Sequence, residues 1–197
     1  MDRTSIISTG IVVMLIVIIF WAGSQSGNWS LPRLPKKSST KVNIYISTAA
    51  NRFYADYGRL PLPVTGAPAT GDLDTDTGTL NGLVAVLIGK EPAGPTLQNP
   101  SGTNYLEGIM PARPGKKPNG PPWVNGLTFD PSLYSVVDAW GNPYRVRLDA
   151  NHDKEIANPN LLEVAEGRKR LSKLAIVWSA GGDKNWDTWE DNPKSWD

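Results

Sequence analysis

The clearest strand patterns of this 197-residue chain lie near its C-terminus, in Asp138-Ala-Trp-Gly-Asn-Pro-Tyr-Arg-Val-Arg-Leu148 and Leu174-Ala-Ile-Val-Trp-Ser-Ala-Gly-Gly-Asp183. In the first, Tyr144 to Leu148 alternates large or basic side chains with aliphatic ones, a pattern that predicts a strand with one buried face. In the second, Leu174 to Trp178 is a short apolar run closed by two glycines, which also predicts a strand. We therefore expect a small antiparallel sheet built on these two segments.

Acidic loops border both predicted strands. The first loop carries oxygen-bearing side chains at every second position, at Asp149, Asn151, Asp153 and Glu155. The second loop lies between the second strand and Trp196, and it contains Asp183, Asp187, Glu190 and Asp191. Closely spaced carboxylates repel one another unless a cation or basic side chains lie between them, so both loops are candidate cation sites.

The order of residues in these blocks resembles the C-terminal half of the major pseudopilin of the type II secretion system, a member of the type IV pilin-like superfamily. The shared pattern is Asp-x-Trp-Gly-x-Pro-Tyr, a strand, a turn, a strand ending in Ser-Ala-Gly-x-Asp, and an acidic loop that closes on Trp. The resemblance covers roughly Val42 to Trp196. The matching residues are Asp138, Trp140, Gly141, Asn142, Tyr144, Ser179, Ala180, Gly181, Asp183, Asp191 and Trp196.

The resemblance implies an α+β fold in which a pilin-like amphipathic helix packs on a small antiparallel sheet with long loops, over residues 41–197. It also implies a structural subunit of a secretion or pilus-like apparatus, whose partners are other pseudopilin or secretion-apparatus subunits. In that family the Asp of the Ser-Ala-Gly-x-Asp block and the acidic pair before the closing Trp hold calcium together with backbone carbonyls. The matching positions are Asp183, Asp191 and Asn192, with Asp187 and Glu190 as substitute ligands because Asn192 replaces an acid.

Hard oxygen donors in a flexible loop suit calcium better than a transition metal. The alternative is that Lys184 and Lys194 neutralise the C-terminal carboxylates. The second candidate, Asp149 with Asn151, Asp153 and Glu155, begins like an EF-hand loop but has Lys154 where glycine is needed and Asn160 in place of the closing Glu. We interpret that segment as a hairpin turn.

An amphipathic helix is predicted before the sheet. Val42, Ile46, Ala49, Phe53 and Tyr57 recur at three- and four-residue steps, and Gly58 and Pro61 end the pattern. Ser38, Ser39 or Thr40 is the expected cap. Residues 25–40 form a linker rich in Pro, Ser and Lys, in which Pro32 and Pro35 forbid a continuous helix. An amphipathic helix of any α+β protein fits the same spacing.

The N-terminus predicts a membrane anchor at residues 1–24. Ile6 to Ala22 is free of charged residues and is long enough, at about 25 Å as a helix, to cross a bilayer. A secretory signal cleaved near Ala22-Gly23-Ser24 is the alternative. The resemblance places the protein in the inner (cytoplasmic) membrane, single-pass, with an extracytoplasmic C-terminal domain. The charges disagree, because only Arg3 precedes the apolar run whereas four basic residues, Arg33, Lys36, Lys37 and Lys41, follow it.

The start of the chain departs from the pseudopilin pattern. Met1-Asp-Arg-Thr-Ser-Ile-Ile-Ser8 has neither the basic leader that a dedicated peptidase removes nor the Glu that docks a subunit in its filament. We therefore expect the N-terminal residues to be retained as a permanent anchor.

The middle of the chain is expected to be mostly loop. Asp72, Asp74 and Asp76 predict a solvated acidic loop, and Leu80 to Ile88 predicts a short apolar helix that ends at Gly89. A short strand is predicted around Tyr105 and Leu106. Residues 108–131, rich in Gly and Pro, predict a surface loop.

Composition narrows the function classes. A net charge of +1 gives no electrostatic case for nucleic acid, and the absence of cysteine excludes thiol chemistry. One histidine, His152, and no recognisable nucleophile or phosphate motif predict a protein that is not an enzyme. An extracytoplasmic carbohydrate-binding or adhesion module is the alternative function, using the C-terminal tryptophans Trp178, Trp186, Trp189 and Trp196, although packing is the simpler role for them.

Overall fold

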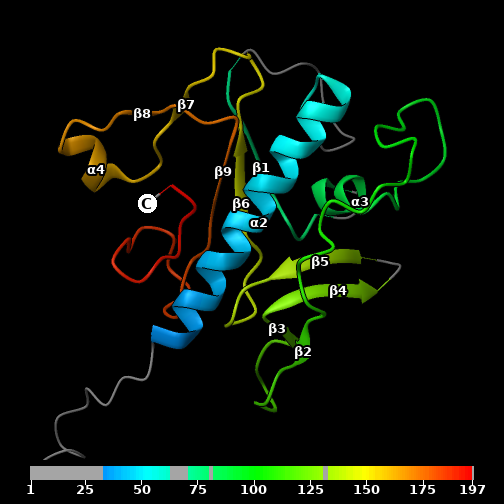
Figure 1. Ribbon diagram of the computed structural model, residues 1–197. Helices are drawn as coiled ribbons and strands as arrows, with labels where there is room; N and C mark the ends of the chain where they lie inside the picture. The colour runs from blue at the N-terminus through cyan, green and yellow to red at the C-terminus, as the bar shows by residue number, and fades with distance from the viewer. Residues whose placement is uncertain (1–32, 63–70, 80–81, 131–132, 197) are drawn as a thin grey trace, which may run out of the picture. The chain divides into compact units, whose positions relative to one another are not determined.

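The computed structural model describes residues 33–62, 71–79, 82–130 and 133–196, and it confirms an α+β fold (Figure 1). Helix α2 (Arg33–Tyr57) packs on a three-stranded antiparallel sheet of order β1-β6-β9. These strands are β1 (Leu73–Asp76), β6 (Arg145–Leu148) and β9 (Ala175–Trp178). Within the described ranges no helix is long and apolar enough to cross a membrane, and the predicted anchor at residues 1–24 lies outside them.

Helix α2 packs on the sheet through the predicted apolar face. Val42, Ile46, Ala49 and Phe53 are buried in one cluster that also contains Val146, Leu148 and Val177 of the sheet. Ser47 Oγ donates a hydrogen bond to the carbonyl of Ala175 at 2.9 Å, which ties the middle of the helix to β9. The helix ends as predicted at Gly58, whose φ of +66° is the left-handed conformation that glycine adopts without strain.

The start of α2 differs from the sequence prediction. The helix begins at Arg33, so residues 33–40, predicted as the end of a linker, are helical. Pro35 is the third helical residue and lies in the first turn. Backbone N–H groups in the first turn have no hydrogen-bond partner within the helix, so the N–H that proline lacks is not needed there. Ser38, Ser39 and Thr40 are therefore not caps, and Thr40 Oγ1 instead donates back to the carbonyl of Lys36 at 3.0 Å.

The two predicted strands pair with one another and are confirmed within one residue. Arg145 lies opposite Trp178, and Leu148 lies opposite Ala175. All four residues of β9 are buried, as the apolar run predicted. The C-terminal segment then lines the free edge of β9, because Ser179 N donates to Pro193 O and Ser195 N donates to Val177 O.

Strand β1 corrects the prediction of a solvated acidic loop at Asp72, Asp74 and Asp76. It pairs with β6, and Arg147 of β6 donates to both carboxylate oxygens of Asp74. Asp72 Oδ2 accepts from the backbone N–H of Ala157 at 2.7 Å. Asp74 is thus neutralised by a cation far along the chain, and Asp72 is hydrogen-bonded by a distant backbone group, whereas Asp76 accepts locally from Gly78 N and Thr79 Oγ1.

The short apolar helix is confirmed as α3 (Leu83–Leu87), although residues 80 and 81 lie outside the described ranges. All five of its residues are buried. Gly89 follows with φ +65°, and a Cβ at this position would lie 2.5 Å from the carbonyl carbon of Gly102. The predicted strand at Tyr105 and Leu106 is wrong, because both residues are buried in a turn whose Tyr105 N donates to Leu87 O.

The predicted surface loop at 108–131 contains strands. Strands β2 (Arg113–Pro114) and β3 (Trp123–Val124) form one hairpin, and β4 (Gly126–Asp130) and β5 (Leu133–Val137) form a second. Residues 110–112 approach β4 closely, since Leu127 N donates to Met110 O and Ala112 N donates to Leu127 O. Gly126 permits this approach, because a Cβ there would lie 2.4 Å from Met110 O.

A second, smaller core lies on the other face of β9. Strand β7 (Ile156–Ala157) precedes α4 (Leu161–Ala165) in the sequence, and β8 (Arg170–Leu171) follows it. The two strands pair with each other. Ile156 and Leu171 are buried together with Ile176, Trp178 and Trp196. This core holds the C-terminal segment against the sheet.

Candidate functional site

The two sequence blocks of the resemblance meet at the buried carboxylate of Asp138. Its Oδ1 accepts from the backbone N–H groups of Trp140 at 2.8 Å and Asn142 at 2.7 Å. Its Oδ2 accepts from Asn142 Nδ2 at 3.0 Å and from Ser179 Oγ. Asn142 Nδ2 also donates to the carbonyl of Gly181 at 2.9 Å, so Asp138 and Asn142 together join the end of β5 to the end of β9.

Burial is the largest electrostatic effect at Asp138. It raises the pKa of this carboxyl above its ordinary value, although the hydrogen bonds from Ser179, Asn142 and Trp140 act in the opposite direction. All four donors point at the carboxylate, which organises the turn at Trp140 and Gly141. The residue therefore acts as a structural junction beneath the C-terminal loop.

The C-terminal loop places three of its predicted ligands on the surface. Asp183, Asp187 and Glu190 are exposed. Asp183 Oδ1 accepts from Asn185 N at 2.8 Å, and Thr188 Oγ1 donates to Oδ2. These hydrogen bonds, that from Thr188 first, lower the pKa of Asp183. The carboxylate thus shapes the loop by ordering its first turn.

Asp191 and Asn192 lie closer to the sheet and converge on Gly181. Asp191 Oδ2 accepts from Gly182 N at 3.0 Å. A Cβ on Gly181 would lie 2.7 Å from Asp191 Oδ2 and 3.0 Å from Asn192 Oδ1, so glycine leaves the space in which these oxygens approach. Asn192 Nδ2 donates to the carbonyls of Asn185 and Trp186, each at 3.2 Å.

Asn192 has an unsatisfied oxygen. The residue is 1% exposed, and its Oδ1 is buried without a hydrogen-bond partner. A buried acceptor left without a partner destabilises the fold by about 1–3 kcal/mol. Among the described residues no three His, Cys, Asp or Glu side chains form a metal-binding group. An amide oxygen and one carboxylate oxygen approach each other at this point, and both are oxygen ligands of the kind that calcium takes.

The second metal candidate forms a turn held by its own hydrogen bonds. Asp149 is buried, and its two oxygens accept from the backbone N–H groups of Asp153 at 3.1 Å and Lys154 at 2.8 Å. Arg170 of β8 pairs with both Asp153 and Glu155, at 2.9 and 2.8 Å. A basic side chain thus separates these carboxylates, which was the alternative to a cation.

The C-terminal tryptophans pack together. Trp178 and Trp196 are each 3% exposed, with ring centroids 6.2 Å apart in an edge-to-face arrangement. Trp189 contacts both rings at 6.4 and 6.0 Å. The guanidinium of Arg145 lies 4.1 Å from the ring centroid of Trp186 and covers one of its faces. These contacts give the tryptophans a packing role.

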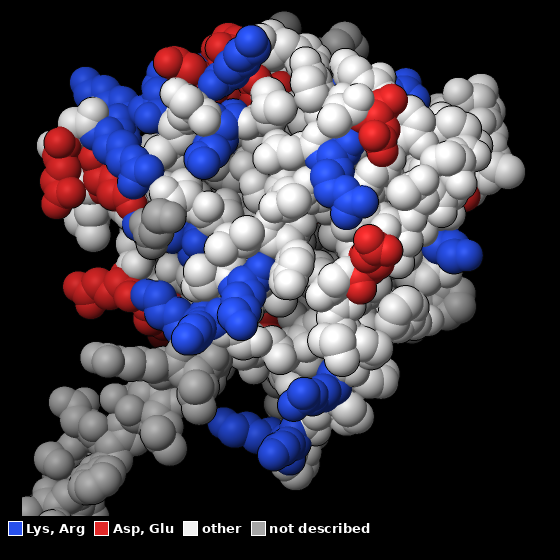
Figure 2. Space-filling model, in the orientation of Figure 1, with Lys and Arg blue, Asp and Glu red and all other residues white. Residues whose placement is uncertain are grey.

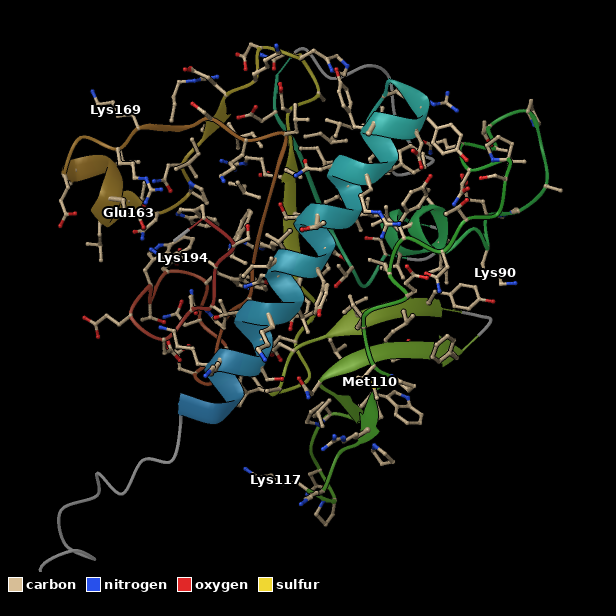
Figure 3. The ribbon with its side chains drawn as sticks, viewed as in Figure 1. Lys90, Met110, Lys117, Glu163, Lys169 and Lys194 are labelled. Carbon is tan, nitrogen blue, oxygen red and sulfur yellow. The ribbon has the colours of Figure 1, made fainter. Side chains whose placement is uncertain are left out.

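Sequence reasoning missed Glu163, which links α4 to the C-terminal segment (Figure 3). Its carboxylate accepts from Lys194 Nζ, from Trp196 Nε1 at 3.3 Å and from Arg168 at 3.2 Å. Asn160 caps α4, and its side-chain Nδ2 donates to the same carboxylate at 3.0 Å, in a variant of the capping box in which the side chain and not the backbone N–H is the donor. The spacing Asn160-x-x-Glu163 is the sequence signal that identifies this helix start.

Removing the charge of Glu163 should destabilise the fold more at neutral pH than at low pH. Burial raises its pKa, yet the hydrogen bonds from Lys194 and Asn158 and the charge of Lys194 overcome this effect and hold the pKa at about 2. Because the folded pKa lies below the unfolded value of about 4.3, the stabilisation is present above that value and is lost as pH falls towards 2. Glu163→Gln should therefore lower the free energy of unfolding by about 1–2 kcal/mol at pH 6 and by clearly less at pH 3.

Urea unfolding followed by tryptophan fluorescence at both pH values measures this difference. Glu166→Gln, at the exposed end of the same helix, is the matched control and should change little at either pH. A loss at Glu163→Gln that is the same at pH 6 and pH 3 would contradict the prediction.

Comparison of the chain with protein-family models, with curated proteins and with solved structures found no match.

Proposed function

We propose that this protein is a pseudopilin-like structural subunit of a type II secretion or pilus-like apparatus, and not an enzyme. Its N-terminal segment anchors it in the inner membrane, and its C-terminal domain lies outside the cytoplasm. The observation that carries the proposal is the junction at Asp138. The residues of the pseudopilin-like pattern, which are separated by about 40 positions, contact one another directly there.

The arrangement of the domain also supports a structural role. A 25-residue helix packs on an antiparallel sheet, and the C-terminal segment closes the edge of β9. Apolar side chains remain exposed on one side of α2 and beside it, with Ile44 51%, Tyr45 50% and Met110 72% exposed. Tyr45 and Met110 line the same shallow hollow. Exposed apolar surface of this kind is typical of a contact site for another protein.

Calcium belongs to this proposal as a stabiliser of the C-terminal loop. Asp191 and Asn192 would hold the ion together with backbone carbonyls of the loop, and Asp183 would complete the set. The support is the unsatisfied Oδ1 of Asn192 beside a carboxylate. The bound ion supplies positive charge among oxygen atoms that otherwise repel one another.

Site-specific cross-linking tests the proposal, since the natural chain has no cysteine. With a bifunctional maleimide in intact cell envelopes, Tyr45→Cys and Met110→Cys should give adducts that mass spectrometry identifies as secretion-apparatus subunits. Leu161→Cys, on an equally exposed position of α4, is the control and should give none. Recovery of the chain in the soluble fraction, or adducts with none of these subunits, would count against the assignment.

A further inference from the structure

Basic side chains surround a hollow beside the first turns of α2. The hollow has a volume of about 750 Å³ and lies between the β2–β3 hairpin and the start of the C-terminal loop. Its lining includes Arg113, Lys116, Lys117 and Lys184, together with the ring of Trp140. None of the described residues that line it is acidic. The hollow therefore presents a positive surface.

The first turns of α2 extend this positive surface. Ser38 Oγ donates to Asn125 Oδ1 at 2.7 Å, which fastens the beginning of the helix to the residue between β3 and β4. Asn125 lines both the basic hollow and a second hollow that includes Lys41. Lys37 and Lys41 are exposed. Figure 2 shows basic side chains over the lower part of this view, and Figure 3 places Lys117 at the tip of the β2–β3 connection, pointing away from the fold.

These cations are not neutralised within the described part of the chain. The ion pairs among the described residues involve Arg52, Arg147, Arg168, Arg170 and Lys194. None of them involves the cationic end, which we define as Lys37, Lys41, Arg113, Lys116, Lys117 and Lys184. Several like charges gathered without counterions repel one another and attract an extended anionic surface.

The path of the chain indicates which anionic surface lies nearest. Helix α2 begins at Arg33, and the apolar segment Ile6 to Ala22 precedes it. The 11 residue-to-residue steps from Ala22 to Arg33 can span at most about 40 Å when the chain is fully extended. A chain anchored through that segment thus keeps Arg33 within about 40 Å of the bilayer, and Lys37 and Lys41 follow within about 12 Å along the helix. Basic residues near a bilayer are attracted to anionic lipids.

We propose that the cationic end docks on anionic phospholipid headgroups of the bilayer in which the chain is anchored. This inference rests on the anchor of the proposed function and goes beyond it, because it assigns the orientation of the domain to a contact between its own lysines and the membrane. Docking on headgroups also gives a role to the basic residues that follow the apolar run. Counting these charges alone would place the C-terminal domain in the cytoplasm. Their role here is to bind headgroups on the side where the domain lies.

Lysine acetylation of the full chain in vesicles tests the proposal. The chain is reconstituted in phosphatidylcholine vesicles, with or without about 30% phosphatidylglycerol, and mass spectrometry follows the rate at each lysine. Lys116 and Lys117 should react roughly threefold more slowly in the anionic vesicles, and the difference should vanish near 0.5 M NaCl because salt screens the attraction. Lys169 and Lys173, which are exposed near β8, are internal controls and should react equally in both.

Charge-reversal variants separate docking from a general salt effect. Lys116→Glu with Lys117→Glu should bring Lys37 and Lys41 to the same acetylation rate in both kinds of vesicle, whereas Lys169→Glu with Lys173→Glu should leave their slowing intact.

Equal acetylation rates of the wild-type chain in the two kinds of vesicle would overturn the proposal. Slowing by inorganic phosphate in neutral vesicles would also overturn it, because that result would identify a pocket for small anions. Release of the chain by an alkaline wash overturns the anchor and the docking together. Retention with equal rates overturns the docking alone.

Discussion

Asp138→Ala should lower the free energy of unfolding by about 3–5 kcal/mol, the largest effect that we expect from a single substitution in this protein. The carboxylate is fully buried and accepts four hydrogen bonds, from Trp140 N, Asn142 N, Asn142 Nδ2 and Ser179 Oγ. Alanine removes the acceptor of the buried Ser179 Oγ and of the partly buried N–H groups of Trp140 and Asn142, while Asn142 Nδ2 keeps the carbonyl of Gly181. Each buried donor left without an acceptor destabilises by about 1–3 kcal/mol before neighbouring groups rearrange. Urea unfolding followed by tryptophan fluorescence measures the loss.

Asp74→Ala is the control for this substitution. Its carboxylate is also hydrogen-bonded, to the guanidinium of Arg147, but its side chain is 60% exposed, so the pair should contribute about 1 kcal/mol or less. A comparable small loss at both positions would show that the Asp138 junction does not hold the two blocks together. Asp138→Asn should fall between the two, because one amide oxygen still accepts while the amide N–H₂ faces other donors.

Calcium at a hundred times its dissociation constant should raise the free energy of unfolding by about 2.7 kcal/mol. The ion would bind the folded C-terminal loop, where Asn192 Oδ1 lies buried without a partner beside the carboxylate of Asp191. For a domain of this size the gain corresponds to a rise in Tm of about 5–10 °C. Thermal unfolding with calcium or with a chelator measures it.

Substitutions at the proposed ligands test where calcium acts. Asp183→Ala and Asp191→Ala should each remove most of the calcium-dependent rise in Tm. Asp153→Ala should preserve it, since Asp153 is held by Arg170 in the other acidic loop. A Tm that calcium does not move, or one that it moves equally in all three variants, would exclude the site.

The local sequence pattern correctly predicts those helices and strands whose buried apolar residues recur at regular intervals or in a continuous run. The strands at Arg145–Leu148 and Ala175–Trp178 were predicted because alternation or a continuous apolar run marks them. The apolar face of α2 and its end at Gly58 were predicted because helical spacing and the conformational freedom of glycine are local properties. The acidic loops were also visible as charge patterns, although their internal hydrogen bonds were not.

The elements that were missed depend on contacts between residues far apart in sequence. Strand β1 looks like an acidic loop until Arg147, 73 positions away, neutralises Asp74. The start of α2 at Arg33 coincides with two long-range contacts of its first turns, from Lys36 to Glu190 and from Ser38 to Asn125. Strands β2 and β3 have two residues each, too few to show any period.

The candidate site divides in the same way. The resemblance to pseudopilins identified Asp183, Asp191 and Asn192 as candidate oxygen donors in one loop. Folding decided that Asn192 is buried with a free oxygen, that Asp183 faces solvent, and that Arg170 lies between the carboxylates of the other loop. A sequence specifies which groups carry charge and which apolar residues recur with the period of a helix or a strand. The hydrogen-bond partner of each buried polar group is set only when distant segments pack together.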